Sequence, residues 1–167
     1  RVTEIGDLAS GASELGVVLD DAQLERLLKF ASLLKRWNRA FNLVSRRDIA
    51  RLISRHLLDS LSLARFVRGE RVLDLGTGAG LPGLPLAIVR PRMSFALVDR
   101  NQRRIRFVRQ AVFELGLTNV DASAIDFAHF RPAILFDTVV SRAVTTPEVL
   151  WRIAAPLLSP GGQALFL

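Results

Sequence analysis

The sequence contains no cysteine and only two histidines, His56 and His129, among its 167 residues. The absence of cysteine excludes a disulfide framework, a thiolate metal site and a cysteine nucleophile. Two histidines are too few for a histidine-rich metal site. We therefore predict that the protein has no metal centre.

The sequence also lacks an apolar run long enough to cross a membrane, and its N-terminus has no secretory signal pattern. We therefore expect a cytoplasmic protein with no membrane partner. Half of the residues are hydrophobic, which is enough for one substantial domain with a short extension. The sequence begins at Arg1 and not at a methionine, which indicates a fragment or a trimmed chain.

Lysine is nearly absent, with Lys29 and Lys35 as its only two instances, so arginine supplies almost all of the positive charge. Genomic base composition can explain the preference for arginine over lysine. It does not explain the formal net charge of +7. An excess of this size favours a polyanionic partner, of which nucleic acid is the obvious example.

The most informative segment present is VLDLGTGAG at 72–80, an apolar strand pattern that leads directly into a glycine-rich turn. Asp74 lies just before the turn, and a second apolar run over 95–98 ends in Asp99. A strand, a glycine turn, a helix and a strand that ends in an acid are typical of a nucleotide-type cofactor site at the carboxyl edge of a parallel sheet. The carboxylate of Asp99 is placed to accept hydrogen bonds from both hydroxyls of a ribose.

The spacing of the glycines favours one cofactor over another. A dinucleotide site has the pattern G-x-G-x-x-G, whereas Gly76, Gly78 and Gly80 form G-x-G-x-G. Pro82 has no N–H to offer a diphosphate, which suits a ligand without a pyrophosphate. Asp74 can orient the cationic amino-acid end of S-adenosylmethionine. We therefore predict a methyltransferase, with a nicotinamide-dependent oxidoreductase as the alternative.

The pattern of apolar residues divides the chain into two parts. Residues 1–68 have helical spacing and no strand signal, which predicts a helical cap packed on the rest. Residues 69–167 alternate strands with helices, which predicts a parallel sheet with right-handed crossovers. Helices are expected over about 3–16, 21–37, 48–67, 83–89, 101–115 and 146–158. Asp20 is the expected cap of the second helix, and a polar break over 38–45 separates the second helix from the third. Strands are expected over 71–75, 94–98, 119–122, 136–140 and 163–167.

The predicted fold is therefore an α/β, Rossmann-like S-adenosylmethionine-dependent methyltransferase fold, a parallel sheet flanked by helices with an N-terminal helical extension. A methyltransferase sheet usually ends in an antiparallel hairpin of two further strands. Because the sequence stops at the fifth expected strand, we expect that hairpin to be missing here.

The acceptor atom can be narrowed by exclusion. A cytosine-C5 enzyme needs a cysteine nucleophile, and none exists. Amino-directed enzymes usually carry an Asn/Asp-Pro-Pro-aromatic motif after the fourth strand, where this sequence has Ser141, Arg142 and Ala143. Guanine N7 remains a suitable acceptor because it has an exposed lone pair and no proton to remove. Catalysis would then consist mostly of positioning.

Five short stretches, distributed along most of the chain from Trp37 onward, form a more specific pattern. They read WNRAFNL at 37–43, RHLLDSL at 55–61, DLGTGAGLPGLP at 74–85, LVD at 97–99 and SRA at 141–143. In these stretches the chain resembles the RsmG (GidB) family of small-subunit rRNA guanine-N7 methyltransferases. The resemblance implies methyl transfer from S-adenosylmethionine to the N7 atom of one specific guanine in the decoding-region loop of 16S rRNA. A monomer is the simplest expectation.

The resemblance also implies roles for individual residues. Asp99 would hold the ribose, Ile125 and Asp126 would meet the adenine, and Arg142 would lie at the junction of cofactor and substrate. Arg142 and Asn42 are the predicted catalytic residues. The predicted cofactor-binding residues are Asp74, Gly76, Thr77, Gly78, Gly80, Leu81, Asp99, Ile125, Asp126 and Arg142.

The chain departs from the family in the adenine loop, where Ala124 and Asp126 stand in place of the usual arginine and glutamate. The shorter carboxylate of Asp126 can still accept a hydrogen bond from the adenine amino group. Arg103 replaces a family lysine, which keeps the charge and changes the hydrogen-bonding geometry. The altered loop leaves a third hypothesis open, a non-catalytic module that binds RNA and cofactor.

Arginines form the predicted RNA-binding rim, although an ordinary solvated face is the default interpretation of any charge run. The substrate-binding candidates are Arg55, Arg100, Arg103, Arg106 and Arg109, with Arg46, Arg47, Arg51 and Arg104 as further members of the basic stretches.

Other polar residues have local interpretations beside functional ones. For His56 we expect a structural bond to Asp59 or to a backbone group at least as readily as a substrate contact. Asp59 is equally suited to pair with Arg55. Asn38 and Asn42 are placed to close a turn between helices. The two tryptophans, Trp37 and Trp151, are predicted to lie in the core.

Overall fold

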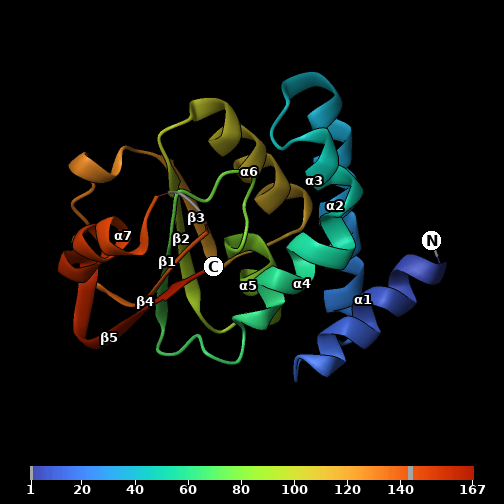
Figure 1. Cartoon of the computed structure of the whole chain (residues 1–167), viewed down its shortest axis with the longest axis horizontal. Helices are drawn as coiled ribbons and strands as arrows, with labels where there is room; N and C mark the ends of the chain where they lie inside the picture. Colours follow the sequence, from blue (N-terminus) through green and yellow to red (C-terminus); the bar gives the residue numbers. More distant parts are fainter. Residues whose placement is uncertain (1, 143–144) are drawn as a thin grey trace.

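A sheet of five parallel strands forms the centre of the molecule, as the sequence predicts (Figure 1). The computed structural model describes residues 2–142 and 145–167. The strand order across the sheet is β3-β2-β1-β4-β5, and each neighbouring pair is parallel. The strands are β1 (Arg71–Leu75), β2 (Ser94–Asp99), β3 (Val120–Ala124), β4 (Phe136–Ser141) and β5 (Leu158–Phe166).

Helices cover both faces of the sheet (Figure 1). On one face lie α5 (Gly83–Val89) and α6 (Gln102–Glu114), and on the other lies α7 (Pro147–Ala154). The side chains of β1 alternate accordingly, since Val72 belongs to the core under α5 and α6, whereas Leu73 and Leu75 belong to the core under α7. A strand buried on both faces is the expected centre of a parallel sheet.

Strand β5 begins at Leu158, five residues earlier than predicted. The pairing between β4 and β5 shifts register between Phe136 and Thr138, because Phe136 pairs with Leu158 and Thr138 with Gln163. The extra residues include Pro160 and two glycines, which in the sequence indicate a turn. Tertiary pairing overrides this local signal, so the turn-like residues become an irregularity within the strand.

Helix α2 (Asp21–Phe41) packs on α5 and α6, and the N-terminal helix α1 (Val2–Glu14) packs on α2 (Figure 1). The predicted cap is confirmed, because the Asp20 carboxylate accepts a hydrogen bond from the backbone N–H of Gln23 at 2.7 Å, and the Gln23 side chain accepts one from Asp20 N–H at 3.1 Å. One continuous apolar core runs from Leu8 in α1 to Val140 in β4. The division of the chain at residue 68 stays a prediction.

The break predicted over 38–45 is present only over 42–45, because α2 continues past Trp37 to Phe41. The ring of Trp37 packs on Phe107 of α6 at a centroid distance of 5.6 Å, and this contact extends the buried face of the helix. Asn38 is buried inside the helix, where its side-chain oxygen accepts the N–H of Val44 at 2.8 Å. Asn42 then ends the helix in the left-handed conformation, with φ 45°.

The segment predicted as one helix over 48–67 consists of three pieces. They are α3 (Arg46–Ala50), the π-helical turn η1 (Leu52–Leu57) and α4 (Leu58–Ser62). In the wider turn the N–H of His56 donates to the carbonyl of Arg51 at 3.3 Å, an i→i−5 bond. π-Helical turns are rare in proteins, and those that do occur are often found at functional sites.

The predicted core position of Trp151 is wrong, since this side chain is 51% exposed. Helix α7 buries Leu150 and Ala154 against the sheet, and Trp151 lies off that face. The chain completes its described part with the single-turn helices η2 (Phe127–His129) and η3 (Ala155–Leu157). Across 2–142 and 145–167 we find no helix with the length and apolar character needed to cross a bilayer.

Candidate cofactor and substrate site

The glycine turn lies at the carboxyl end of β1 and is held against β2. The N–H groups of Gly76 and Thr77 both donate to the carbonyl of Val98, at 2.9 and 3.0 Å. Gly78 has φ 58°, and a Cβ at this position would meet no atom within 4 Å. Gly80 has φ 90°, and a Cβ there would lie 2.5 Å from Cδ1 of Leu84. Gly78 therefore keeps open space beside the turn, and Gly80 permits close packing against α5.

Asp74 lies behind the turn and is fully buried. Its Oδ2 atom accepts hydrogen bonds from Thr77 Oγ1 at 2.7 Å and from Gly83 N–H at 2.8 Å, so it joins both ends of the turn. Its Oδ1 atom has no hydrogen-bond partner within the described residues. Burial raises the pKa of the Asp74 carboxyl to about 7. The predicted role of this carboxyl toward the amino-acid end of the cofactor stays a prediction.

Asp99 links the turn to the loop before α6. Its two carboxylate oxygens accept the N–H of Gly78 at 2.9 Å and the N–H of Asn101 at 2.9 Å. Arg104 Nη1 lies 3.9 Å from Asp99 Oδ2. The carboxylate is therefore fixed in orientation at the end of β2, at the place where the sequence predicts a ribose.

A cavity of about 570 Å³ opens beside the turn. Its volume is in the range of small-molecule and cofactor sites. Of the predicted cofactor-binding residues, the cavity is lined by Gly76, Thr77, Gly78, Leu81, Asp99, Asp126 and Arg142. Asp74, Gly80 and Ile125 lie outside the lining, and the N–H of Ile125 donates to the carbonyl of Asp99 at 3.0 Å.

Apart from Leu81, the large apolar side chains of the cavity lining were not predicted from the sequence. Leu43 and Val44 follow α2, Phe127 follows Asp126, and Val149 and Ile153 lie one turn apart on α7. Phe127 carried a usable signal, because it directly follows the two predicted adenine contacts. Val149 and Ile153 come from a helix, and Leu43 and Val44 come from the loop after α2; tertiary packing sets the positions of both over the sheet edge.

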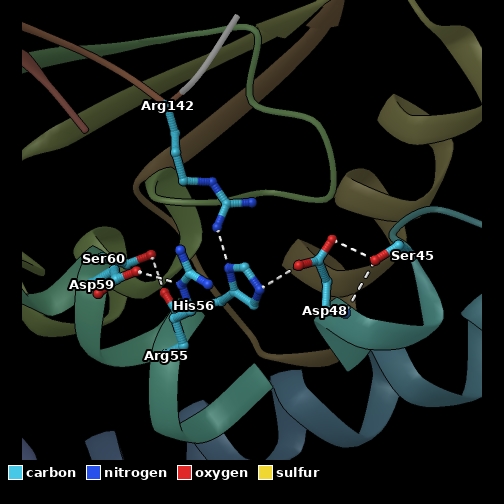
Figure 2. A network of polar contacts seen from close by, with 7 residues as sticks. All are labelled: Ser45, Asp48, Arg55, His56, Asp59, Ser60 and Arg142. Atoms are coloured by element: carbon cyan, nitrogen blue, oxygen red, sulfur yellow. Dashed lines mark hydrogen bonds and ion pairs between the residues drawn. The ribbon is translucent and has the colours of Figure 1, made fainter. Parts of the chain in front are cut away.

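Arg142 follows β4 and lines the cavity, and Figure 2 shows its side chain extending to His56 in the π-helical turn. Its Nη1 lies 2.6 Å from Nδ1 of His56. Desolvation lowers the pKa of Arg142, and the carboxylates of Asp74 and Asp48 act in the opposite direction. Ala143, the last residue of the predicted motif, lies outside the described residues.

The expected bond between His56 and Asp59 is wrong. His56 lies between Asp48 and Arg142, whereas Asp59 pairs with Arg55 at 3.8 Å, the alternative expected for that carboxylate (Figure 2). The prediction assumed a regular α-helix. The i→i−5 turn changes the angular spacing between His56 and the residues before it, so His56 faces different partners.

A second, basic cavity of about 720 Å³ adjoins the first and shares Leu43 and Arg104 with it. Asn42, predicted as catalytic, lines this second cavity together with Arg103 and Arg106, and it does not line the first. Both roles stay predictions for these residues.

The remaining arginines of the predicted RNA-binding rim lie in different parts of the structure. Arg100 lines the first cavity. Arg109 donates its Nε–H to the carbonyl of Ala122 in β3 at 2.9 Å, which uses one of its donors within the fold. Arg55 pairs with a carboxylate on the adjoining helix, and the other arginines of that basic stretch lie on α3 and at its end.

The strand order and the glycine turn define the fold as that of the Rossmann-like S-adenosylmethionine-dependent methyltransferases. A solved SAM-dependent methyltransferase from Thiobacillus denitrificans, in complex with S-adenosyl-L-homocysteine, matches 80% of this chain and 52% of its own with TM-score 0.53 and 20% identity. Coclaurine N-methyltransferase, bound to N-methylheliamine and SAH, matches 66% of this chain and 33% of its own with TM-score 0.57 and 21% identity. These likenesses show the fold.

The family follows from sequence. The family model described as rRNA small subunit methyltransferase G matches residues 23–167. Proteins named ribosomal RNA small subunit methyltransferase G are 51% identical in Methylococcus capsulatus, over 96% of this chain and 78% of that protein, and 47% identical in Chromohalobacter salexigens, over 95% and 76%. The chain belongs to the rRNA small subunit methyltransferase G family.

Proposed function

We propose that this protein transfers the methyl group of S-adenosylmethionine to N7 of guanine 527 in the decoding-region loop of 16S rRNA. One observation carries the proposal. The cavity beside the glycine turn, which Asp99 and Arg142 line, adjoins a basic cavity that suits a polyanionic substrate. Membership of the family supplies the expected target.

The residues present fit the cofactor. The open side of Gly78 leaves room for a ligand against the backbone, and the fixed carboxylate of Asp99 offers two acceptors to a ribose. Asp126 and Phe127 provide one polar and one apolar contact for an adenine on the same wall. When bound, S-adenosylmethionine supplies an electrophilic methyl group on a sulfonium sulfur.

The chemistry asks little acid or base work of the protein. Guanine N7 has a lone pair and no proton, so no general base is required at the acceptor. The contribution of the chain is to hold the acceptor atom in line with the methyl group and to exclude water, and such positioning can account for a large part of a rate enhancement. Arg142 is a cationic side chain in the lining of the first cavity, and it donates hydrogen bonds without accepting any.

The RNA side of the proposal rests on Arg103, Arg104 and Arg106, which surround the second cavity. Guanidinium groups bind phosphate oxygens through paired donors, so a cluster of this kind suits the backbone of a looped RNA. We infer that the protein acts as a monomer on rRNA of the small subunit, in the cytoplasm.

Transfer of labelled methyl from S-adenosylmethionine to small subunits that lack their own modification tests the proposal, with the label mapped on the RNA. Label at N7 of one guanine in the decoding-region loop is the expected result. Naked 16S rRNA and assembled subunits, run side by side, identify the substrate form. Cofactor binding without any transfer would contradict the proposal and favour the non-catalytic module. The family membership argues against the nicotinamide-dependent alternative.

A further inference from the structure

The imidazole of His56 is held between an anion and a cation (Figure 2). Its Nε2 lies 3.0 Å from Asp48 Oδ1, and its Nδ1 lies 2.6 Å from Arg142 Nη1. The side chain of His56 is 12% exposed, so water has little access to the ring. The two partners come from different elements, since Asp48 lies on α3 and Arg142 follows β4.

These two contacts determine where the proton of the ring lies. A guanidinium is a donor only and keeps its charge in proteins. Nδ1 must therefore accept the bond from Arg142 with its lone pair, so His56 is neutral. The proton of the neutral ring is then on Nε2, where it is donated to the carboxylate of Asp48.

The anion on the far side of the ring is itself fixed. Ser45 caps α3, and its Oγ donates to Asp48 Oδ2 at 2.7 Å while it accepts the N–H of Asp48 at 3.1 Å. The hydrogen bond from Ser45, followed by that from His56, holds the pKa of Asp48 below its ordinary value. The carboxylate therefore stays charged and keeps the tautomer of His56 in place.

The backbone supports the same orientation. His56 is in the π-helical turn η1, and its carbonyl accepts a hydrogen bond from Ser60 Oγ at 2.7 Å. The turn separates two α-helical pieces, and it contains the residue that faces Arg142. A continuous α-helix would not have this irregularity. An irregular turn at this point is the kind of local cost that functional sites often carry.

We propose that His56, as the neutral Nε2–H tautomer anchored on Asp48, is a positioning residue that sets the place of the Arg142 guanidinium at the junction of cofactor and substrate. This rests on the proposed methyl-transfer function. His56 acts through Arg142 and needs no contact with the reacting atoms. The bond from one Nη1–H to His56 leaves the other guanidinium donors for the cavity that Arg142 lines.

The tautomer is measurable directly. Long-range ¹H–¹⁵N correlation spectra of the ¹⁵N-labelled chain contain signals from two histidines only, and His129→Gln assigns them. The expected result at pH 8 is a protonated Nε2 and an unprotonated Nδ1 for His56. A protonated Nδ1, or a doubly protonated ring at that pH, would overturn the proposal. This readout needs no substrate, so it stands even if the protein transfers no methyl group.

Two variants test the positioning role through activity. His56→Asn places an amide oxygen near the former Nδ1 and so retains an acceptor for Arg142, whereas His56→Gln places its amide near the former Nε2 and retains only the Asp48 side. We expect kcat to fall about a hundredfold in H56Q and about tenfold or less in H56N, with the Kd for S-adenosylmethionine within about threefold of wild type in both. His129→Gln, on η2, is the control with unchanged activity.

Equal losses of kcat in H56N and H56Q, in step with their thermal stability, would show a merely structural histidine and overturn the proposal. A wild-type chain that transfers no methyl under any condition would instead refute the proposed function.

Discussion

The glycine turn after β1 and the Arg142–His56–Asp48 contact both reach the first cavity, the latter through Arg142, but they are built in opposite ways. The turn is local, because Asp74, Thr77 and Gly83 contact one another within nine residues of sequence. The bond between His56 and Arg142 joins residues 86 positions apart. The first is a backbone device that needs particular residues at fixed spacing. The second depends on two layers of the fold being brought together, so changes in packing can disturb it without touching the turn.

The buried acid of the turn gives the largest expected effect. The Asp74 carboxyl has an ordinary pKa of 3.8, and burial raises it to about 7 in the folded chain. Between these values the folded chain retains a proton that the unfolded chain has released, so stability falls as pH rises. Relative to Asp74→Asn, which does not titrate, we expect the wild type to lose about 4 kcal/mol of unfolding free energy between about pH 4 and pH 8.

Urea unfolding of both proteins at the two pH values measures this difference. The comparison removes the contributions of all other titrating groups, because these are common to the two chains. A difference between wild type and D74N that does not change with pH would show that Asp74 is ionised in the fold and that the turn tolerates a buried charge.

Asp99→Ala separates cofactor binding from RNA binding. The variant loses the acceptors for a ribose and also frees the N–H groups of Gly78 and Asn101. Loss of charge-assisted hydrogen bonds of this kind costs about 2–3 kcal/mol, so we expect the Kd for S-adenosylmethionine to rise about a hundredfold. RNA affinity should be nearly unchanged.

Calorimetric titration with S-adenosylmethionine checks this expectation, and Asp121→Ala, an exposed carboxylate on β3, is the matched control. If D99A bound the cofactor as tightly as D121A, the assignment of the cavity to the cofactor would be wrong.

Two glycines of the turn distinguish packing from ligand space. Both have positive φ, so alanine is strained at each by about 1 kcal/mol. Gly80→Ala adds a clash with Leu84, and we expect a total loss of about 2–3 kcal/mol of stability. Gly78→Ala meets no protein atom, so it should lose about 1 kcal/mol of stability and weaken cofactor binding instead. Thermal unfolding measures the loss of stability, and calorimetry measures cofactor binding, in both variants. Equal losses of stability and of cofactor affinity in the two variants would contradict this division.

Charge reversal at Arg103 and Arg106 tests the second cavity and gives the smallest change per residue. Two lost phosphate contacts should reduce the slope of log K against log salt for RNA binding by about 1.5. Arg26→Glu, an exposed residue near the start of α2 and about 22 Å along that helix from Phe41, is the control. A salt slope equal to that of the control would move the RNA-binding face elsewhere on the surface.

Much of the fold follows from local patterns. The strand β1 is predicted with both of its ends because an apolar run is directly followed by obligatory turn residues. Helix α5 is likewise predicted over 83–89, because the glycine and proline residues before it mark its start. The Asp20 cap of α2 follows from the same kind of short-range chemistry.

Errors concentrate where contacts between layers override local signals. Asn38 looks like a turn residue, yet the packing of Trp37 on α6 keeps it inside α2. Pro160 and its two neighbouring glycines look like a loop, yet they extend β5. Trp151 looks like a core residue, yet α7 buries a different face.

The sequence by itself determined the parallel sheet, the acid-flanked glycine turn and the cofactor class, because strand periodicity and positive-φ turns are properties of a few adjacent residues. Only the tertiary structure decided that Asp74 is buried behind the turn, that Asn42 faces the basic cavity, and that His56 holds Arg142. These depend on which side chains meet across α3, the π-helical turn and the end of β4. Such meetings are set by the packing of whole layers, which local spacing does not encode.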